Sequence, residues 1–400
     1  MPGFEVIGKE EEQEIMEVLK HKILFRYEFD EQRGGMYKVE AFEKAFSQYC
    51  GVDYALAVSS GTAALRVALS ALGIGPGDEV ITQGFTFVAT WEAILDAGAV
   101  PVFAEIDDTL CLDPNDIAGK ISPRTKAIIP VHMCGSQARI EQIVQEADLH
   151  NLPVIEDTAQ SCGGKLKGKS LGSFGSCGTF SFDSVKTMTT GEGGMVITND
   201  KDLFERTSEY HDHGHDHDPS VGRGLEKRRF IGFNYRMMEL QGALGLAQLR
   251  KLDDVILAKQ RENKARIKEA LSRIDQVTFR NILDPDGDIA SFLMFLLPTR
   301  EKAAAFNKTM ADEGCPAVDW YENTWHYYEK WEHLLERKSL LNSGYPFNNE
   351  SGEMRCSYDA SALPETAGLL SRCLTIPINI HMGEQIPKIV QAIEKASLVI

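Results

Sequence analysis

Short apolar segments alternate with helix-like segments from about residue 40 onward, and this alternation restricts the fold more than any other feature. The apolar segments are rich in β-branched residues and lie at residues 54–58, 79–81, 100–104, 127–131 and 153–156. Helix-like stretches, such as residues 62–72 and 139–150, lie between several of them. This pattern is typical of βαβ units. It predicts an α/β fold in which a mostly parallel sheet is covered by helices on both faces.

The pattern changes after residue 180. Two strand-like segments, residues 179–182 and 193–199, flank a glycine-rich turn, and an antiparallel member of the same sheet is expected among them. Apolar residues at helical spacing then predict helices at residues 238–251 and 254–274. A further strand is expected at residues 292–298 and a last helix near residues 383–398.

A chain of 400 residues exceeds what one compact core usually holds. We therefore expect a large domain over residues 31–250 and a smaller α+β domain over residues 251–400. An N-terminal segment, residues 1–30, is expected to pack with the small domain.

The charge balance excludes some classes of partner. The 42 Lys and Arg residues face 59 Asp and Glu residues, which gives a net charge of −17. Nucleic acids and anionic membranes are bound through basic patches, so neither is an expected partner. An anionic small substrate remains compatible with the sequence, because a local pocket can oppose the overall charge.

The cysteines and the N-terminal sequence predict a cytoplasmic protein. The eight cysteines are scattered without a CxxC pair, which favours reduced thiols over disulfides or a zinc site. The first 22 residues are acidic where a secretory signal is basic and apolar, and no apolar run approaches the roughly 18 residues of a membrane helix.

The first segment that indicates a chemical role is Ser59-Ser60-Gly61-Thr62. It follows a predicted strand and begins a predicted helix. Unpaired N–H groups and the positive end of the helix dipole make such a junction suitable for a phosphate. Gly61 allows close backbone approach, and Thr62 supplies a hydroxyl. An ordinary capped helix start explains the segment equally well, and it matches no nucleotide-binding motif.

The second segment is an apolar strand that ends in Asp157. The carboxyl ends of parallel strands are where α/β folds bind ligands. A carboxylate there can hold a metal, pair with an arginine, or keep the ring nitrogen of a cofactor protonated. A capping role for the next helix is an equally good interpretation.

The third segment places Lys186 after a strand, among apolar and hydroxyl side chains. Loss of water lowers the pKa of a lysine and makes its amine nucleophilic, as Schiff-base chemistry requires. Lys165, Lys167 and Lys169 lie instead in the solvated sequence GGKLKGKS. If one of these lysines is reactive, it is Lys186.

These three segments, in this order, resemble the DegT/DnrJ/EryC1/StrS family of pyridoxal-phosphate-dependent sugar aminotransferases. The resemblance covers nearly the whole chain and includes VEAFEKAFSQYCGVDYALAVSSGTAAL, GDEVITQGFTFVAT, IEDTAQSCGG and GFNYRMMELQGALGLAQL. It implies the aspartate-aminotransferase-like fold (fold type I), with pyridoxal 5′-phosphate as cofactor and pyridoxamine 5′-phosphate as its intermediate form. It also implies L-glutamate as donor, with 2-oxoglutarate as the product, a carbonyl sugar as acceptor, and a homodimer with shared active sites.

The resemblance also implies roles for individual residues. Lys186 would form the Schiff base and later shuttle the proton, and Asp157 would pair with the pyridine nitrogen. Gln160 would approach the ring hydroxyl, and Phe87 would stack on the ring. The cofactor phosphate would be bound by Gly61, Thr62 and Ser181, and by Asn234 of the neighbouring subunit.

One position departs from the family pattern, because Asp183 stands where the family commonly has a histidine. Together with FRYEFD, FDSVKTMTTGEGG and TWHYYEKWEHLL, it resembles the branch that makes 8-amino-3,8-dideoxy-manno-octulosonate for lipopolysaccharide. The acceptor would then be the 8-oxo form of 3-deoxy-manno-octulosonate. The alternatives are a nucleotide-linked keto-deoxysugar as acceptor, a sugar dehydratase or a non-catalytic regulatory protein. The presence of Lys186 opposes the dehydratase, in which this lysine is typically replaced.

Candidate substrate residues are His132, Trp325, His326 and Arg229. A buried structural histidine is an equally good interpretation of His132, and packing is favoured for the other aromatic residues near Trp325. Arg229, with Arg223, Lys227 and Arg228, is expected to bind a carboxylate or to form a solvated charged face. The His- and Asp-rich residues 211–218 favour a solvated loop, and no metal site is predicted.

Overall fold

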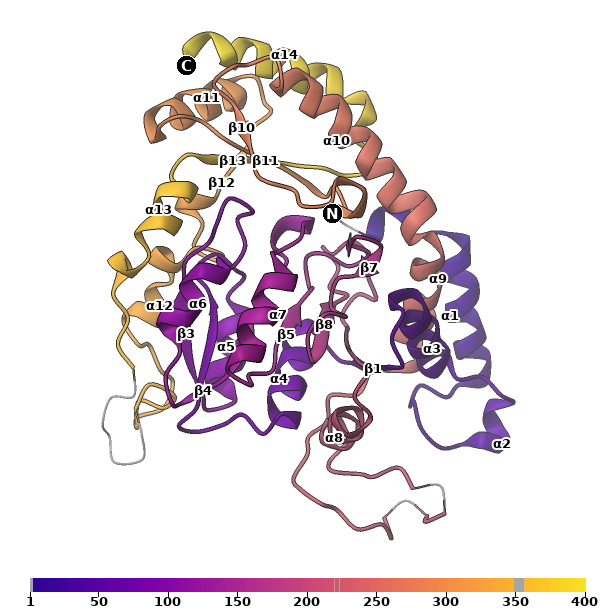
Figure 1. Cartoon of the computed structure of the whole chain (residues 1–400). Coiled ribbons are helices and arrows are strands. Elements are labelled where there is room, and N and C mark those ends of the chain that lie inside the picture. The colour runs from indigo at the N-terminus through magenta and orange to yellow at the C-terminus, as the bar shows by residue number, and fades with distance from the viewer. Residues whose placement is uncertain (1–2, 219, 223, 349–355) are drawn as a thin grey trace.

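Two runs of paired strands form the sheet of the large domain in the computed structural model, which describes residues 3–218, 220–222, 224–348 and 356–400 (Figure 1). One run has the order β1-β9-β8-β5, and the other has the order β3-β2-β4. Parallel bridges between Ile128 and Val154 and between Val131 and Asp157 join them. The strands are β1 (Tyr54–Val58), β2 (Glu79–Gln83), β3 (Val100–Ala104), β4 (Thr125–Ile129), β5 (Ile155–Asp157), β8 (Cys177–Ser181) and β9 (Gly194–Thr198).

Strand β9 runs antiparallel to both of its neighbours, whereas β5 and β8 are parallel, as are β2, β3 and β4. This confirms the prediction of a mostly parallel sheet with an antiparallel member.

Helices cover both faces of this sheet. Side chains of β1 alternate between two cores, with Leu56 and Val58 in one and Ala55 and Ala57 in the other. The first core also takes side chains from α4, α5 and α8, and the second takes side chains from α3. Helices α6 and α7 contribute to a third core. The helices are α3 (Lys38–Cys50), α4 (Gly61–Ala71), α5 (Ala89–Asp96), α6 (Pro114–Lys120), α7 (Ile140–Leu149) and α8 (Lys201–His211).

A nearly continuous helical rod connects the two domains (Figure 1). It consists of α9 (Glu239–Lys251), a π-helical turn η3 (Leu252–Leu257) and α10 (Ala258–Leu271). The boundary expected at residue 250 therefore falls inside the rod.

The small domain contains an antiparallel sheet with the order β10-β11-β13-β12. Helices α10, α11 and α14 share one apolar core with this sheet. The elements are β10 (Thr278–Phe279), β11 (Phe292–Leu296), α11 (Arg300–Asp312), β12 (Val318–Asp319), β13 (Cys373–Pro377) and α14 (Ile386–Ala396).

Part of the C-terminal half returns to the large domain. Tyr327, Tyr328 and Trp331 are at most 2% exposed and share a core with Phe85 and Phe103. Short helices α12 (Glu332–Leu335) and α13 (Pro364–Leu370) contribute to the same core. Residues 327–335 and 364–370 therefore share a core with the large domain, although they were expected in the small one.

The N-terminal segment contacts both domains. It contains η1 (Gly3–Val6), α1 (Lys9–His21) and α2 (Asp30–Arg33). Helix α1 packs along α9, where Glu11 accepts a hydrogen bond of 2.7 Å from Lys251. At the other end of the segment, the Glu5 carboxylate accepts a 3.0 Å hydrogen bond from the backbone N–H of Ile380, which follows β13.

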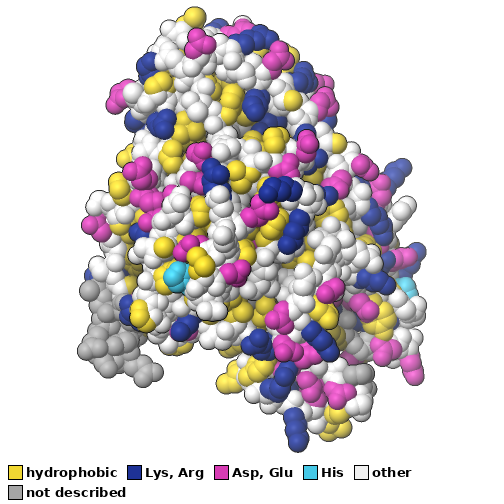
Figure 2. Space-filling view, in the orientation of Figure 1, with side chains coloured by type: hydrophobic (Ala, Val, Ile, Leu, Met, Phe, Trp, Pro, Cys, Tyr) yellow, Lys and Arg dark blue, Asp and Glu magenta, His cyan; other side chains and the backbone are white. Residues whose placement is uncertain are grey.

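The surface carries charges of both signs. Figure 2 shows acidic and basic side chains interspersed over one face of the molecule. All eight cysteines are free thiols. Within the part of the chain that the structure describes, no helix combines the length and apolar character needed to cross a bilayer.

Candidate active site

A cavity of about 390 Å³ lies at the carboxyl ends of β5 and β8, between the sheet and residues of the C-terminal half. Phe292, Trp320 and Pro377 close it from that half. The sequence candidates that line it are Gly61, Thr62, Phe87, Asp157, Gln160, Ser181, Lys186 and His326. The structure therefore brings together the three segments of Gly61, Asp157 and Lys186, for which the sequence predicted a chemical role.

The turn from β1 into α4 forms one wall of this cavity. Ser60 is the N-cap of α4, and its Oγ accepts a hydrogen bond of 3.0 Å from the N–H of Ala63. A Cβ on Gly61 would lie only 2.6 Å from the Cβ of Ser181, so the close approach of α4 to β8 requires glycine there. The helix start and the Ser181 hydroxyl thus lie side by side, which suits a phosphate group.

Asp157 is 3% exposed and is the last residue of β5. Its Oδ2 accepts a hydrogen bond of 2.9 Å from Thr90, and its Oδ1 accepts one of 3.1 Å from the N–H of Ala159. Burial raises the pKa of this carboxyl, while the two hydrogen bonds and the nearby Lys186 oppose the shift. A cationic group placed beside Asp157 would favour the ionised carboxylate.

Lys186 lies in the loop that leaves β8. Asp183 shapes this loop, because its carboxylate accepts a 2.8 Å hydrogen bond from Val185 N–H and its carbonyl accepts a 3.0 Å hydrogen bond from Lys186 N–H. Burial lowers the pKa of the Lys186 amine, and the charges of Asp157 and Asp183 oppose the shift. The lowered pKa makes the neutral, nucleophilic amine more accessible.

Aromatic rings also line the cavity. The Lys186 Nζ lies 5.8 Å from the ring centroid of Phe87. The Trp325 ring stacks on Phe87 with centroids 5.5 Å apart and an angle of 9° between the planes. Trp325 is 59% exposed and lines a second cavity beside the first. Phe87 thus has the candidate cofactor region on one side and Trp325 on another.

His326 lines the cavity as a neutral imidazole, because burial and the nearby Lys186 lower its pKa to about 3. Its Nδ1 lies 3.0 Å from the Oδ1 of Asn323, which also accepts a hydrogen bond from Trp325 N–H. Since that oxygen only accepts, Nδ1 carries the proton. The Nε2 atom is then an acceptor for a ligand hydroxyl.

His132 does not line the cavity, which corrects its candidacy as a substrate residue. Its side chain is fully buried, and its Nδ1 accepts a 3.1 Å hydrogen bond from Ala138 N–H. The Nε2 therefore donates to the Glu156 carboxylate at 2.9 Å. Glu156 also accepts hydrogen bonds from three backbone N–H groups, those of Gly172, Phe174 and Gly175. The structural interpretation of His132 fits this geometry.

Arg229 is also outside the cavity. Its guanidinium pairs with Glu209, and its side chain is 57% exposed. It therefore has a partner other than a ligand within the chain. Arg223 lies outside the described residues.

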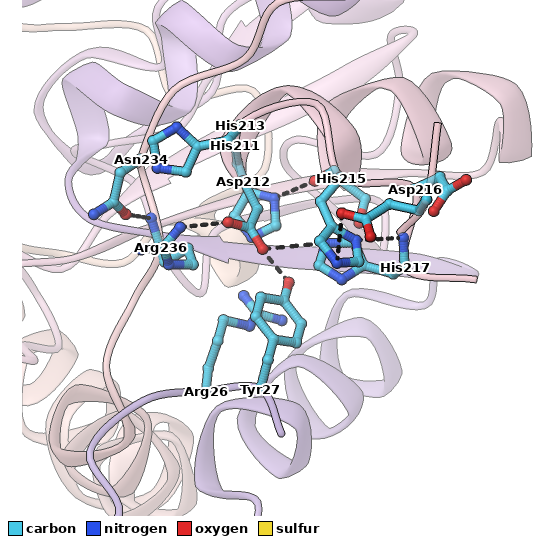
Figure 3. A network of polar contacts seen from close by, with 12 residues as sticks. Arg26, Tyr27, His211, Asp212, His213, His215, Asp216, His217, Asn234 and Arg236 are labelled. Carbon is cyan, nitrogen blue, oxygen red and sulfur yellow. Dashed lines mark hydrogen bonds and ion pairs between the residues drawn. The ribbon is translucent and has the colours of Figure 1, made fainter. Parts of the chain in front are cut away.

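Asn234 belongs to a segment that runs beside the end of β1. Asp212 and Asn234 form an antiparallel bridge, and the Tyr235 carbonyl accepts a 2.8 Å hydrogen bond from Ser59 N–H. Figure 3 shows Asn234 next to Arg236, which pairs with the buried Asp212. Asn234 is exposed and does not line the cavity.

The His- and Asp-rich segment is more buried than the expected solvated loop. His211 and Asp212 are fully buried, and the His217 ring lies 4.3 Å from that of Tyr27 (Figure 3). Among residues 3–218, 220–222, 224–348 and 356–400, no group of three or more His, Cys, Asp or Glu side chains is arranged to hold a metal ion.

The sequence interpretation missed Thr90 and Glu192, which also line the cavity. Thr90 follows Phe87 by three residues in FTFVAT, a spacing that brings both side chains to one side of a helical turn. Glu192 lies in the glycine-rich turn after Lys186, and burial, with a contribution from Asp183, raises its pKa.

Comparisons with known proteins agree on one family. The sequence profile of the DegT/DnrJ/EryC1/StrS aminotransferase family matches residues 5–346. GDP-perosamine synthase of Caulobacter vibrioides is 45% identical over 233 residues, which are 57% of this chain and 60% of that protein. The chain thus spans about 60% of the length of this curated relative. The spore coat polysaccharide biosynthesis protein SpsC of Bacillus subtilis is 39% identical over 76% of this chain and 77% of its own.

The fold is similar to that of a solved structure as well. NtdA from Bacillus subtilis, solved with bound cofactor PMP, superimposes with a TM-score of 0.80 and 25% identity. The match covers 99% of this chain and 84% of NtdA. It confirms the expected type I fold.

Proposed function

Because the chain belongs to the DegT/DnrJ/EryC1/StrS aminotransferase family, we propose that it transfers an amino group from L-glutamate to a carbonyl sugar. The observation that carries this proposal is the convergence of Lys186 and Asp157 on one cavity beside the N-terminus of α4. A nucleophilic amine, a buried carboxylate and a phosphate-binding turn are the groups that this chemistry requires.

Pyridoxal 5′-phosphate is the cofactor of this family, and the residues present fit it. Burial raises the pKa of the Asp157 carboxyl. The positive charge of a pyridinium nitrogen beside it would stabilise the ionised carboxylate. The N–H groups at Gly61 and Thr62 and the hydroxyl of Ser181 would hold the phosphate. Phe87 would stack on the ring, and Gln160 would approach the ring hydroxyl.

The bound cofactor would supply an electron sink for the carbanion at the substrate Cα. The chain would supply the other elements of the reaction. Thr90 and the N–H of Ala159 orient the carboxylate of Asp157 through two hydrogen bonds. Lys186, whose amine has a lowered pKa, would act as nucleophile and then move the proton at Cα. Since donor and acceptor would use one cavity in turn, ping-pong kinetics are expected.

The site is proposed to be completed by a second copy of the chain. Asn234 is exposed, and its segment is held beside β1 by the bridge between Val58 and Arg236. From this position it would contribute to the phosphate site of the neighbouring subunit. None of the described residues that line the cavity is an arginine. The cation for a substrate carboxylate would therefore also come from the second copy, and Arg229 remains a candidate.

The acceptor is proposed to be the 8-oxo form of 3-deoxy-manno-octulosonate, which would give 8-amino-3,8-dideoxy-manno-octulosonate for lipopolysaccharide. The segments around Tyr27, Asp183 and Trp325 support this choice by their resemblance to that branch. Trp325 and His326 would bind the sugar, one by stacking and the other through the acceptor at Nε2.

A nucleotide-linked keto-deoxysugar is the second candidate acceptor. The similarity to GDP-perosamine synthase over 233 residues favours it. A comparison of kcat/KM for the two acceptors, with glutamate as donor, separates them. The octulosonate assignment predicts a preference of at least about tenfold, or about 1.4 kcal/mol in transition-state binding. If kcat/KM were instead at least about tenfold higher for the nucleotide-linked sugar, the octulosonate assignment would be wrong. The aminotransferase proposal would still stand.

A further inference from the structure

Gly3 contacts the backbone of the candidate catalytic lysine. Gly3 is buried, and its N–H donates a hydrogen bond of 2.7 Å to the carbonyl oxygen of Lys186. The two residues are far apart in sequence, so this contact is a tertiary one. It fixes the backbone from which the Lys186 side chain enters the cavity.

The contact leaves space for glycine alone. A Cβ on Gly3 would lie 2.7 Å from the Cα of Met188 and 2.8 Å from the nitrogen of Thr189. Both are backbone atoms of the loop that carries Lys186, and they cannot rotate away as a side chain would. A larger residue at position 3 must therefore move this loop or the N-terminal segment.

The same segment reaches the small domain two residues later. The Glu5 carboxylate accepts the 3.0 Å hydrogen bond from Ile380, and the ring of His381 lies 3.1 Å from the Glu5 carbonyl oxygen. These residues follow β13, whose last residue, Pro377, lines the cavity. The Val6 carbonyl accepts a 2.9 Å hydrogen bond from Lys251, which anchors the segment to α9.

A second connection joins the lysine loop to α1. Gln248 is fully buried, and its Oε1 accepts a 3.4 Å hydrogen bond from the N–H of Thr189. Its Nε2 donates a 3.0 Å hydrogen bond to Glu11, which is also fully buried. The lysine loop is thus supported from the N-terminal segment at two points.

We propose that residues 3–6 are a positioning element that sets the Lys186 backbone and couples it to the small-domain segment after β13. This inference rests on the role proposed above for Lys186. Gly3 and Glu5 contact no reacting atom, so they act through the loop. Movement of the Pro377 wall around a substrate would be transmitted to Lys186 along this connection.

The test compares Gly3→Ala with Gly8→Ala. Gly8 belongs to the same segment, but a Cβ there meets no atom closer than 3.9 Å. The readout is the pH at which Lys186 of the cofactor-free protein is half-labelled by an amine-reactive sulfonate, measured by peptide mass spectrometry. Gly3→Ala is expected to shift this pH and to change the labelling rate at neutral pH by about threefold or more, whereas Gly8→Ala leaves both unchanged. Unchanged labelling in Gly3→Ala would overturn the proposal.

A second pair of variants keeps the test informative if Gly3→Ala does not fold. Glu5→Gln retains an oxygen that accepts from Ile380, and Glu5→Ala removes it. Glu5→Ala is expected to lower kcat for the glutamate half-reaction by about threefold to tenfold without a matching rise in KM, and Glu5→Gln is expected to restore it. Equal kcat in both variants and in the unaltered enzyme would refute the coupling to the small domain.

These outcomes are distinct from failure of the proposed function. If Lys186 were not the reactive lysine, Lys186→Ala would keep its activity whatever the labelling of the Gly3 variants showed. If only the positioning proposal were wrong, Lys186→Ala would lose activity while Gly3→Ala and Gly8→Ala labelled alike.

Discussion

The Thr90 hydroxyl donates a 2.9 Å hydrogen bond to the Asp157 carboxylate, and both side chains line the same cavity. Thr90 comes from the first turn of α5 and Asp157 from the end of β5, so the bond joins two elements of the large domain. It fixes the orientation of a carboxylate that burial would otherwise favour in its neutral form.

Replacing Lys186 by alanine should abolish amino transfer. The amine is the proposed nucleophile and proton carrier, so turnover is expected to fall by about 10⁴-fold or more. Lys167→Ala is the control, because Lys167 is 70% exposed and pairs with Glu141 on the surface. Steady-state kinetics measure the loss, and the visible absorption of the cofactor-loaded protein should disappear only in Lys186→Ala. Full activity in Lys186→Ala would refute the mechanism.

Asp157→Asn should slow the half-reaction with glutamate by about 100-fold or more, since the fixed charge opposite the cofactor ring is lost. Lys186 is retained, so the variant should still bind the cofactor covalently. Single-turnover absorbance measurements separate the two effects. A decrease of less than about tenfold would show that another group keeps the ring protonated.

The same variant should stabilise the cofactor-free protein at neutral pH. Burial raises the folded-state pKa of Asp157. The protonated carboxyl therefore makes its whole contribution to the free energy of unfolding at pH values below the pKa that Asp157 has in the unfolded chain. This contribution is lost as the pH rises through the higher pKa of the folded state. The amide introduced by Asp157→Asn carries no charge, so the unfolding temperature of the variant should exceed that of the unaltered protein at pH 7, and the difference should vanish below about pH 4. A lower unfolding temperature of the variant at pH 7 would contradict this.

Asp183→Asn should lower the pKa of Lys186. The Asp183 charge opposes the effect of burial on the lysine, and asparagine keeps an oxygen that accepts from Val185 N–H while removing the charge. Half-labelling of Lys186 in the cofactor-free protein should then occur at lower pH. An unchanged labelling profile would mean that solvent screens this charge.

Trp325→Ala should raise the KM for the sugar acceptor by about tenfold, because the ring is exposed and lies against Phe87. The glutamate half-reaction should change by less than about twofold if the ring serves the acceptor alone. Trp325→Phe retains an aromatic face and is expected to recover most of the affinity. Equal effects on glutamate and acceptor would show that the ring supports the cofactor wall instead.

His132→Ala should cost stability and leave the KM values unchanged. The fully buried imidazole links Ala138 N–H to Glu156, and its removal leaves a buried carboxylate with one donor fewer. A loss of about 3 kcal/mol in unfolding free energy is expected from chemical denaturation. A selective change in acceptor KM would restore His132 as a substrate residue.

The sequence was sufficient to predict the parallel sheet and the residues at its carboxyl edge. Apolar segments indicate which strands are buried, and a polar side chain at or soon after the end of such a strand lies near the carboxyl edge of the sheet. Asp157 and Ser181 end β5 and β8, Lys186 lies in the loop after β8, and all three line the cavity.

His132 shows where this reasoning fails. It also follows a predicted strand, but its side chain turns toward Glu156 and away from the cavity, and only the fold shows which direction each residue takes. For Tyr327 and Trp331, burial agrees with the packing that the sequence favoured, but the core that they join was not predictable. Their positions depend on long-range contacts with Phe85 and Phe103, which no local spacing encodes. The expected role of Asn234 involves a second copy of the chain, so it stays a prediction.

Glu156 and Asp157 are consecutive in β5 and face opposite sides of it, one toward the His132 side and the other toward the cavity. If β5 paired with a shift of one residue, their environments would be exchanged. Glu156 would lose four hydrogen-bond donors, and Asp157 would be buried where the longer side chain is needed. The carboxylate that the proposed chemistry requires therefore stands next to one that disfavours a shifted pairing of the same strand. A strand that paired with this shift would leave a buried carboxylate without its hydrogen-bond donors, and this cost would arise during folding, before any cofactor binds.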